Sequence, residues 1–213
     1  MNKTFKMTSI AMLTALSIVT NLFTIPISGS NSMSFTIAIC FFTGIYFGAF
    51  PAALVGFLGD LIAHLILPQG TYNAFLALST TLFGVICALV YKIKLPKLVK
   101  LIIAAVMSYV VCLCCFNTFG LWMVYKAKVP PTFTGLIALI SMDKAQIDTS
   151  FWLYLAGRAP WSAINIVINI VIIAGLQQSG VIDKLMAKIS DKDKSQQADN
   201  HHEEENQKIK SDD

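Results

Sequence analysis

The chain has 213 residues, of which 55% are hydrophobic and only 13% charged. This composition excludes an ordinary soluble domain, in which about a quarter of the residues are charged. Long apolar segments with lysines at their ends are typical of a protein that crosses a membrane several times. The net charge of +4 then reflects orientation in the membrane, and nucleic acid is not an expected partner.

Six apolar segments are predicted to span the membrane, because a span needs about 20 residues to cross a hydrocarbon core of about 30 Å. The first has no small-residue cleavage site and is interpreted as an uncleaved helix. The second and third are short and are divided by "GAFPA", in which Pro51 suits the first turn of a helix. The prediction is an all-α integral membrane protein with six transmembrane helices, at roughly 5–27, 34–50, 51–67, 72–92, 98–125 and 151–178.

The lysines indicate how the spans are oriented. With the N-terminus inside, the cytoplasmic segments carry most of the lysines, and the external side holds only Lys126, Lys128 and Lys144. This bias follows the positive-inside rule and places both termini in the cytoplasm. The external connections are then 28–33, 68–72 and 126–150, and the apolar part of the last one is either a lid or an interfacial segment.

Two domains are expected. Residues 1–182 form the six-helix transmembrane domain. Residues 183–213 are strongly charged and have almost no apolar content, which predicts a largely disordered cytoplasmic tail.

Few ionisable side chains fall within the spans, and each is costly there, which makes it a candidate for function. They are Asp60, His64 and Arg158, and Arg158 is the one arginine of the chain. A guanidinium near the external surface suits the bidentate capture of a carboxylate. The alternative is that Asp60 and Arg158 pair with each other.

Uncharged polar side chains accompany the arginine. Arg158, Ser162, Asn165 and Asn169 follow one another at spacings that put them on one helix face. In the fifth segment Asn117 interrupts an apolar run, and Trp122 follows it. Trp122 and Trp161 are candidates for stacking on a flat ring, whereas the asparagines could instead bond between helices.

Several chemistries find no support in the sequence. It has no Walker lysine loop, no HExxH and no GxSxG, and Asp60 has no second carboxylate within a span. The five cysteines lie in apolar runs without the company of a metal site and are interpreted as buried thiols. We therefore expect a membrane-embedded binding protein that is not an enzyme and that has no cofactor or metal.

Longer motifs resemble a known family. The spaced alanines Ala11 and Ala15, together with "GFLGDLIAHLILPQGTY" at 56–72, are similar to the S components, the substrate-binding subunits of energy-coupling factor (ECF) vitamin transporters, across residues 1–182. Within that family, "FNTFGLWMVY" (116–125) and "GRAPW" (157–161) most resemble folate-specific members. This chain departs from them at Gly120, which displaces the following Leu-Trp pair.

The resemblance implies an S-component-like bundle in a bacterial cell membrane. Such a subunit captures a vitamin, here folate, from outside. It releases the vitamin inside when it is docked, through Ala11 and Ala15, on a transmembrane coupling subunit with two ATPase subunits. Alternatives are pantothenate, a pyrimidine- or purine-like vitamin, or a membrane assembly protein without a small ligand.

For folate, the resemblance and the chemistry together suggest a set of contacts. Arg158 would bind a carboxylate, Asp60 or Asn117 would pair with the pterin edge, and an aromatic side chain would stack on the ring; Asp60 could instead be architectural. The expected substrate-binding residues are Arg158, Asn117, Trp122, Trp161, Asp60, Tyr72 and Asn165.

Overall fold

The computed structural model describes residues 3–28, 31–68, 72–125 and 151–180. The chain divides into two compact units: a larger one of residues 10–174, and a smaller one that combines residues 1–9 with 175–213. In the smaller unit the described residues are the first turns of the N-terminal helix and the end of the last helix. The predicted tail (183–213) and the predicted lid (126–150) lie outside the described residues.

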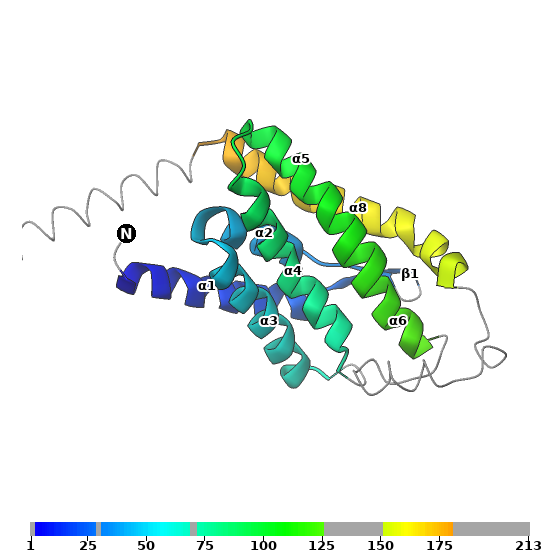
Figure 1. The fold of residues 1–213 in the computed structure, drawn as a ribbon. Helices are drawn as coiled ribbons and strands as arrows, with labels where there is room; N and C mark the ends of the chain where they lie inside the picture. The colour runs from blue at the N-terminus through cyan, green and yellow to red at the C-terminus, as the bar shows by residue number, and fades with distance from the viewer. Residues whose placement is uncertain (1–2, 29–30, 69–71, 126–150, 181–213) are drawn as a thin grey trace, which may run out of the picture. The chain divides into compact units, whose positions relative to one another are not determined.

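Apart from one short hairpin and the connecting turns, the described residues are helical (Figure 1), which confirms the predicted all-α class. Five helices are long and apolar enough to cross a membrane, and a shorter apolar helix joins them. The elements are α1 (Lys3–Leu22), β1 (Ile25–Ser28), β2 (Asn31–Met33), α2 (Thr36–Phe47), α3 (Ala49–Ile66), α4 (Ala74–Tyr91), α5 (Lys97–Ser108), η1 (Tyr109–Asn117), α6 (Thr118–Tyr125) and α8 (Phe151–Gln178).

The first helix is shorter than predicted. It ends at Leu22 instead of residue 27, and the chain continues as the antiparallel hairpin β1–β2, in which Ile25 pairs with Met33. The reason is local: Pro26 has no N–H for a helix, and it biases the residue before it toward extended backbone. The predicted loop 28–33 is therefore largely part of a hairpin.

Helices α2 and α3 are separate, as predicted. Gly48 ends α2 with a φ of 92°, a conformation that residues with a side chain rarely adopt. Pro51 lies in the first turn of α3, where its missing N–H leaves no helical hydrogen bond unmade. The short "GAFPA" segment thus reverses the chain between two apolar helices.

The core of the larger unit lies around α4, which packs against α2, α3, α5 and η1. Buried side chains at its centre include Phe41, Phe83, Leu101 and Ile173, from four different helices. The segments α5, η1 and α6 form one continuous helical rod (Figure 1), as the predicted single span at 98–125 requires. Of the cysteines in this region, Cys112 is buried but Cys115 is exposed, so the prediction of buried thiols is wrong for Cys115.

Candidate functional site

Arg158 is held inside the larger unit. Only 8% of its surface is exposed, and its Nη2 donates a hydrogen bond of 3.2 Å to Oδ1 of Asn117. Its guanidinium carbon lies 5.8 Å from the ring centroid of Tyr154, which precedes it by one turn of α8. The guanidinium presents a planar fork of donors beside an amide and an aromatic ring, a group suited to bind an anion.

The π-helical segment η1 determines where Asn117 lies. Its wider turn ends at Thr118, whose N–H and hydroxyl both donate to the carbonyl of Leu113, five residues earlier. At the other end of η1, the hydroxyl of Tyr109 donates a 3.0 Å hydrogen bond to the carbonyl of Ala159 on α8. The segment is thus fastened to α8 at the residue after Arg158. Such π-helical turns are frequent at functional sites.

An aromatic cluster borders the arginine. Trp122 on α6 stacks on Phe119 at 6.0 Å and meets Phe151 of α8 edge-on at 5.8 Å. Tyr154 packs against the same cluster, which connects it to Arg158. Trp122 is 6% exposed, and within the described residues its Nε1–H is buried without a hydrogen-bond partner. Because such a donor is costly to leave unpaired, it indicates a position where a ligand acceptor would fit.

Gly120 allows the start of α4 to approach α6. A Cβ atom at this position would lie 2.7 Å from Oδ1 of Asn73 and 2.7 Å from Cβ of Phe75. Asn73 caps α4, and its Oδ1 accepts the N–H of Phe75 at 3.1 Å. The departure at Gly120 noted in the sequence is therefore a packing requirement, since a larger residue would displace the capping side chain.

A second polar group lies at the end of α3. The rings of His64 and Tyr72 meet edge-on at 5.1 Å. Burial, and secondarily the charge of Asp60, raise the pKa of Tyr72 to about 12, so its hydroxyl stays protonated at neutral pH. Within the described residues that hydroxyl is buried and has no hydrogen-bond partner.

No ion pair joins Asp60 to Arg158 in this part of the chain, so the predicted alternative of a mutual pair does not form.

Asn169 connects α8 to the base of the hairpin. It is 1% exposed; its Oδ1 accepts the N–H of Ala38 at 3.0 Å, and its Nδ2 donates to the carbonyl of Ser34 at 3.0 Å. The same Nδ2 also lies 3.1 Å from Oδ1 of Asn165, on the polar face that begins at Arg158. The polar stripe predicted from sequence therefore faces the interior. Its C-terminal part, at Asn165 and Asn169, holds helices together.

Replacing Asn169 with alanine should lower the melting temperature by roughly 4–10 °C. The change removes the donor to the part-buried carbonyl of Ser34 and one of the two acceptors of the Ala38 N–H, which keeps its bond to the carbonyl of Phe35, at about 1–3 kcal/mol in total. Thermal unfolding in detergent measures the effect. Ser162→Ala, on the same face, is the matched control and should shift the midpoint by about 2 °C or less. Equal melting temperatures for Asn169→Ala and the wild type would exclude the structural role.

Comparison with known proteins identifies the family. The family model described as "ECF transporter, substrate-specific component" matches residues 5–176. The chain belongs to this family. No curated protein matches it.

Two solved structures share the fold of this substrate-specific component. One is described as the structure and mechanism of the S component of a bacterial ECF transporter; it has a TM-score of 0.58 at 18% identity, and the match covers 84% of this chain and 96% of that one. The other, a crystal structure of FolT bound with folic acid, has a TM-score of 0.53 at 18% identity and covers 76% and 93%. The predicted family and fold are confirmed.

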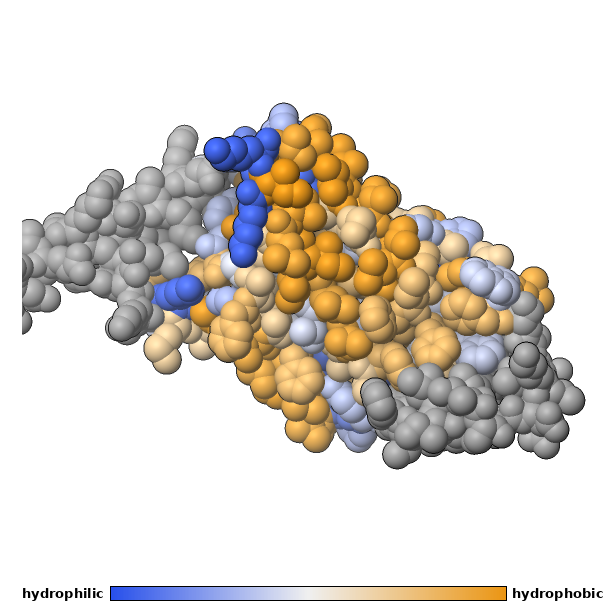
Figure 2. Space-filling view, in the orientation of Figure 1, coloured by the Kyte–Doolittle hydropathy of each residue, from blue (hydrophilic) through white to orange (hydrophobic). Residues whose placement is uncertain are grey.

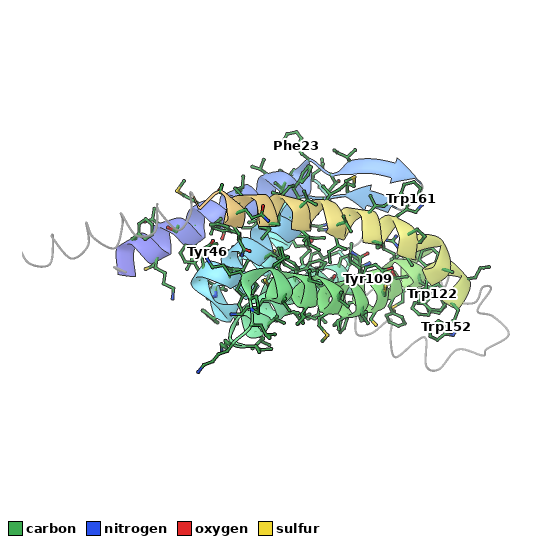
Figure 3. All side chains as sticks on the ribbon, turned by 90° about the horizontal axis from the view of Figure 1, so that it is seen from above. Phe23, Tyr46, Tyr109, Trp122, Trp152 and Trp161 are labelled. Carbon is green, nitrogen blue, oxygen red and sulfur yellow. The ribbon has the colours of Figure 1, made fainter. Side chains whose placement is uncertain are left out.

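The structure brings part of the predicted site together. Arg158, Asn117 and Trp122 form one group, and Tyr72 lies near Asp60 in another. Trp161 is 38% exposed and lies on the other side of α8 from Trp122 (Figure 3). Asn165 is buried and contacts Asn169.

Two aromatic residues of the site were missed by the sequence analysis of this substrate-specific component. Tyr154 precedes Arg158 by four residues, a spacing that places both on one helix face and that could have identified it. Tyr109 carried no such signal, because its contact with the carbonyl of Ala159 joins two helices that are distant in sequence.

Proposed function

We propose that this substrate-specific component binds an anionic vitamin, with folate as the first-choice ligand, beside Arg158. The observation that carries the proposal is the buried guanidinium that contacts Asn117 and Tyr154 next to an aromatic cluster. A carboxylate would bind there by charge-assisted hydrogen bonds, while aromatic walls would accept a flat ring. The fold shared with the FolT structure bound with folic acid supports the choice of folate.

The remaining polar groups suit the other parts of folate. The pterin presents hydrogen-bond donors and acceptors on one edge. Asp60 supplies acceptors, and the protonated hydroxyl of Tyr72 supplies a donor that has no partner in the described residues. The buried N–H of Trp122 is proposed to donate to the ligand, since Phe119 and Phe151 already contact its ring. Asn165, which is buried, is proposed to extend the site along α8. Trp161 is exposed, so we do not include it in the proposed site.

Uptake is proposed to require a transmembrane coupling subunit and two ATPase subunits, with the coupling subunit docking on α1. Ala11 and Ala15 are exposed on this helix, next to the exposed side chains of Met12 and Leu16. The buried contact of α1 is made instead by Ser17, against Gly59 of α3. This leaves a face with small residues that another helix could approach closely. We further propose a location in the cell membrane with both termini in the cytoplasm.

Isothermal titration of the detergent-purified full chain tests the choice of vitamin. Folate should give a saturable one-to-one binding heat without any partner subunit, and pantothenate, thiamine and riboflavin should give none. Binding of pantothenate or of another of these vitamins in place of folate would keep the transport role and overturn the ligand. No binding heat with any of them would remove the support for vitamin capture by the isolated chain.

A further inference from the structure

A basic turn joins α4 to α5. Residues 92–100 read Lys-Ile-Lys-Leu-Pro-Lys-Leu-Val-Lys, and the sequence contains no acid between Asp60 and Asp143. Asp60 is the one acid among the described residues, and Lys92 and Lys94 form no ion pair within that part of the chain. The charges of Lys92 and Lys94 are therefore not neutralised by another described side chain.

Hydrogen bonds at both ends of the turn hold it in a defined shape. Nζ of Lys100 donates a 3.2 Å hydrogen bond to the carbonyl of Tyr91 and lies 5.6 Å from the centroid of that tyrosine ring. Backbone hydrogen bonds from Ile93 to Val90 and from Leu95 to Ile93, both 3.1 Å, complete the turn. Lys100 is thus structural, while Lys92, Lys94 and Lys97 are exposed.

Exposed aliphatic side chains alternate with these lysines. Ile93 is 51% exposed and Leu98 54%, and Leu95 and Val99 are exposed as well. Figure 2 shows strongly hydrophilic side chains at the end of the unit where α5 begins, directly beside an apolar surface. The turn connects two helices that are each long and apolar enough to span a membrane, so it must lie at a membrane surface. At that depth aliphatic groups reach the hydrocarbon while lysine stems extend to the phosphates.

We propose that the turn 92–100 binds the headgroup phosphates of anionic phospholipids. Charge complementarity selects this partner, since three exposed ammonium groups face a layer of phosphates and the intervening aliphatic side chains favour lipid over a soluble anion. Each lysine near an anionic membrane surface contributes roughly a fivefold gain in affinity. This proposal does not depend on which vitamin the protein binds.

Native mass spectrometry of the detergent-solubilised full chain tests the proposal. It compares phosphatidylglycerol with phosphatidylcholine of the same acyl chains. The wild type should bind phosphatidylglycerol more tightly. Lys92→Gln/Lys94→Gln/Lys97→Gln should lose about 100-fold of that affinity, three fivefold steps, and keep its affinity for phosphatidylcholine. Lys100 is left in place because it holds the turn.

The matched control is Lys192→Gln/Lys194→Gln/Lys208→Gln, which removes the same charge from the C-terminal segment and should leave lipid binding unchanged. An equal loss in this control would show that net charge alone matters, and it would overturn the proposal. Equal binding of both lipids by the wild type would overturn it too. Displacement of phosphatidylglycerol by an equal concentration of inorganic phosphate would assign the turn to soluble anions instead.

Discussion

Replacing Arg158 with alanine should weaken binding of the anionic vitamin by between about 30-fold and several thousandfold, while the protein remains folded. Truncating one partner of a buried, hydrogen-bonded charge pair costs about 2–5 kcal/mol, and each 1.4 kcal/mol is a factor of ten in affinity. The fold should persist, because Asn117 and Tyr154, which the guanidinium contacts, do not belong to the apolar core around Phe41. Isothermal titration measures the affinity, and thermal unfolding checks the fold.

Two further variants separate charge from geometry. Arg158→Lys keeps the positive charge but loses the planar fork, so its affinity should fall between those of the wild type and the alanine variant. Lys92→Ala removes one cation from an exposed position and should bind the vitamin normally. Wild-type affinity in Arg158→Ala would exclude the arginine as the anchor, even if folate is the ligand.

Introducing tryptophan at Ala11 or Ala15 should reduce vitamin uptake to background and leave the affinity for the vitamin unchanged. Both alanines are exposed on α1, so the indole does not disturb packing within the chain, but it prevents another helix from approaching closely. Uptake is measured in cells that contain the coupling and ATPase subunits, and affinity is measured on the purified chain.

The matched control for this experiment is Val171→Trp, which adds the same side chain to an exposed position of α8. It should transport normally, because α8 is not the proposed docking face. Full uptake by both alanine variants would contradict docking through α1. A loss of vitamin binding in either variant would instead indicate damage to the protein itself.

Hydropathy alone predicted most of the helices. The windows at 72–92 and 151–178 agree closely with α4 and α8, because an apolar run of about 20 residues has few other ways to satisfy its backbone in a membrane. The break at Gly48 and Pro51 was also predictable, since glycine allows backbone conformations that other residues avoid and proline fixes its own φ. The predicted orientation of the termini remains a prediction.

The boundaries and irregular segments were harder to predict. The end of α1 at Leu22 and the hairpin that follows depend on Pro26 and on pairing between Ile25 and Met33. The π-helical segment contains no proline and no glycine, so nothing in "YVVCLCCFN" distinguishes it from an α-helix. Its contacts with α8, through Tyr109 and Asn117, lie about 40 to 50 residues away in sequence.

By itself, the sequence predicted a membrane protein with six apolar spans and one arginine on an inward-facing polar helix face, because length, hydropathy and helical spacing are local properties. Only the tertiary structure decided which residues meet that arginine. It placed Asn117 and Tyr154 against Arg158, left Asp60 unpaired with it, and exposed Trp161. The reason is that the rotation of each helix about its axis is set by packing, including the close approach at Gly120 and the extra residue in each turn of η1, and not by hydropathy.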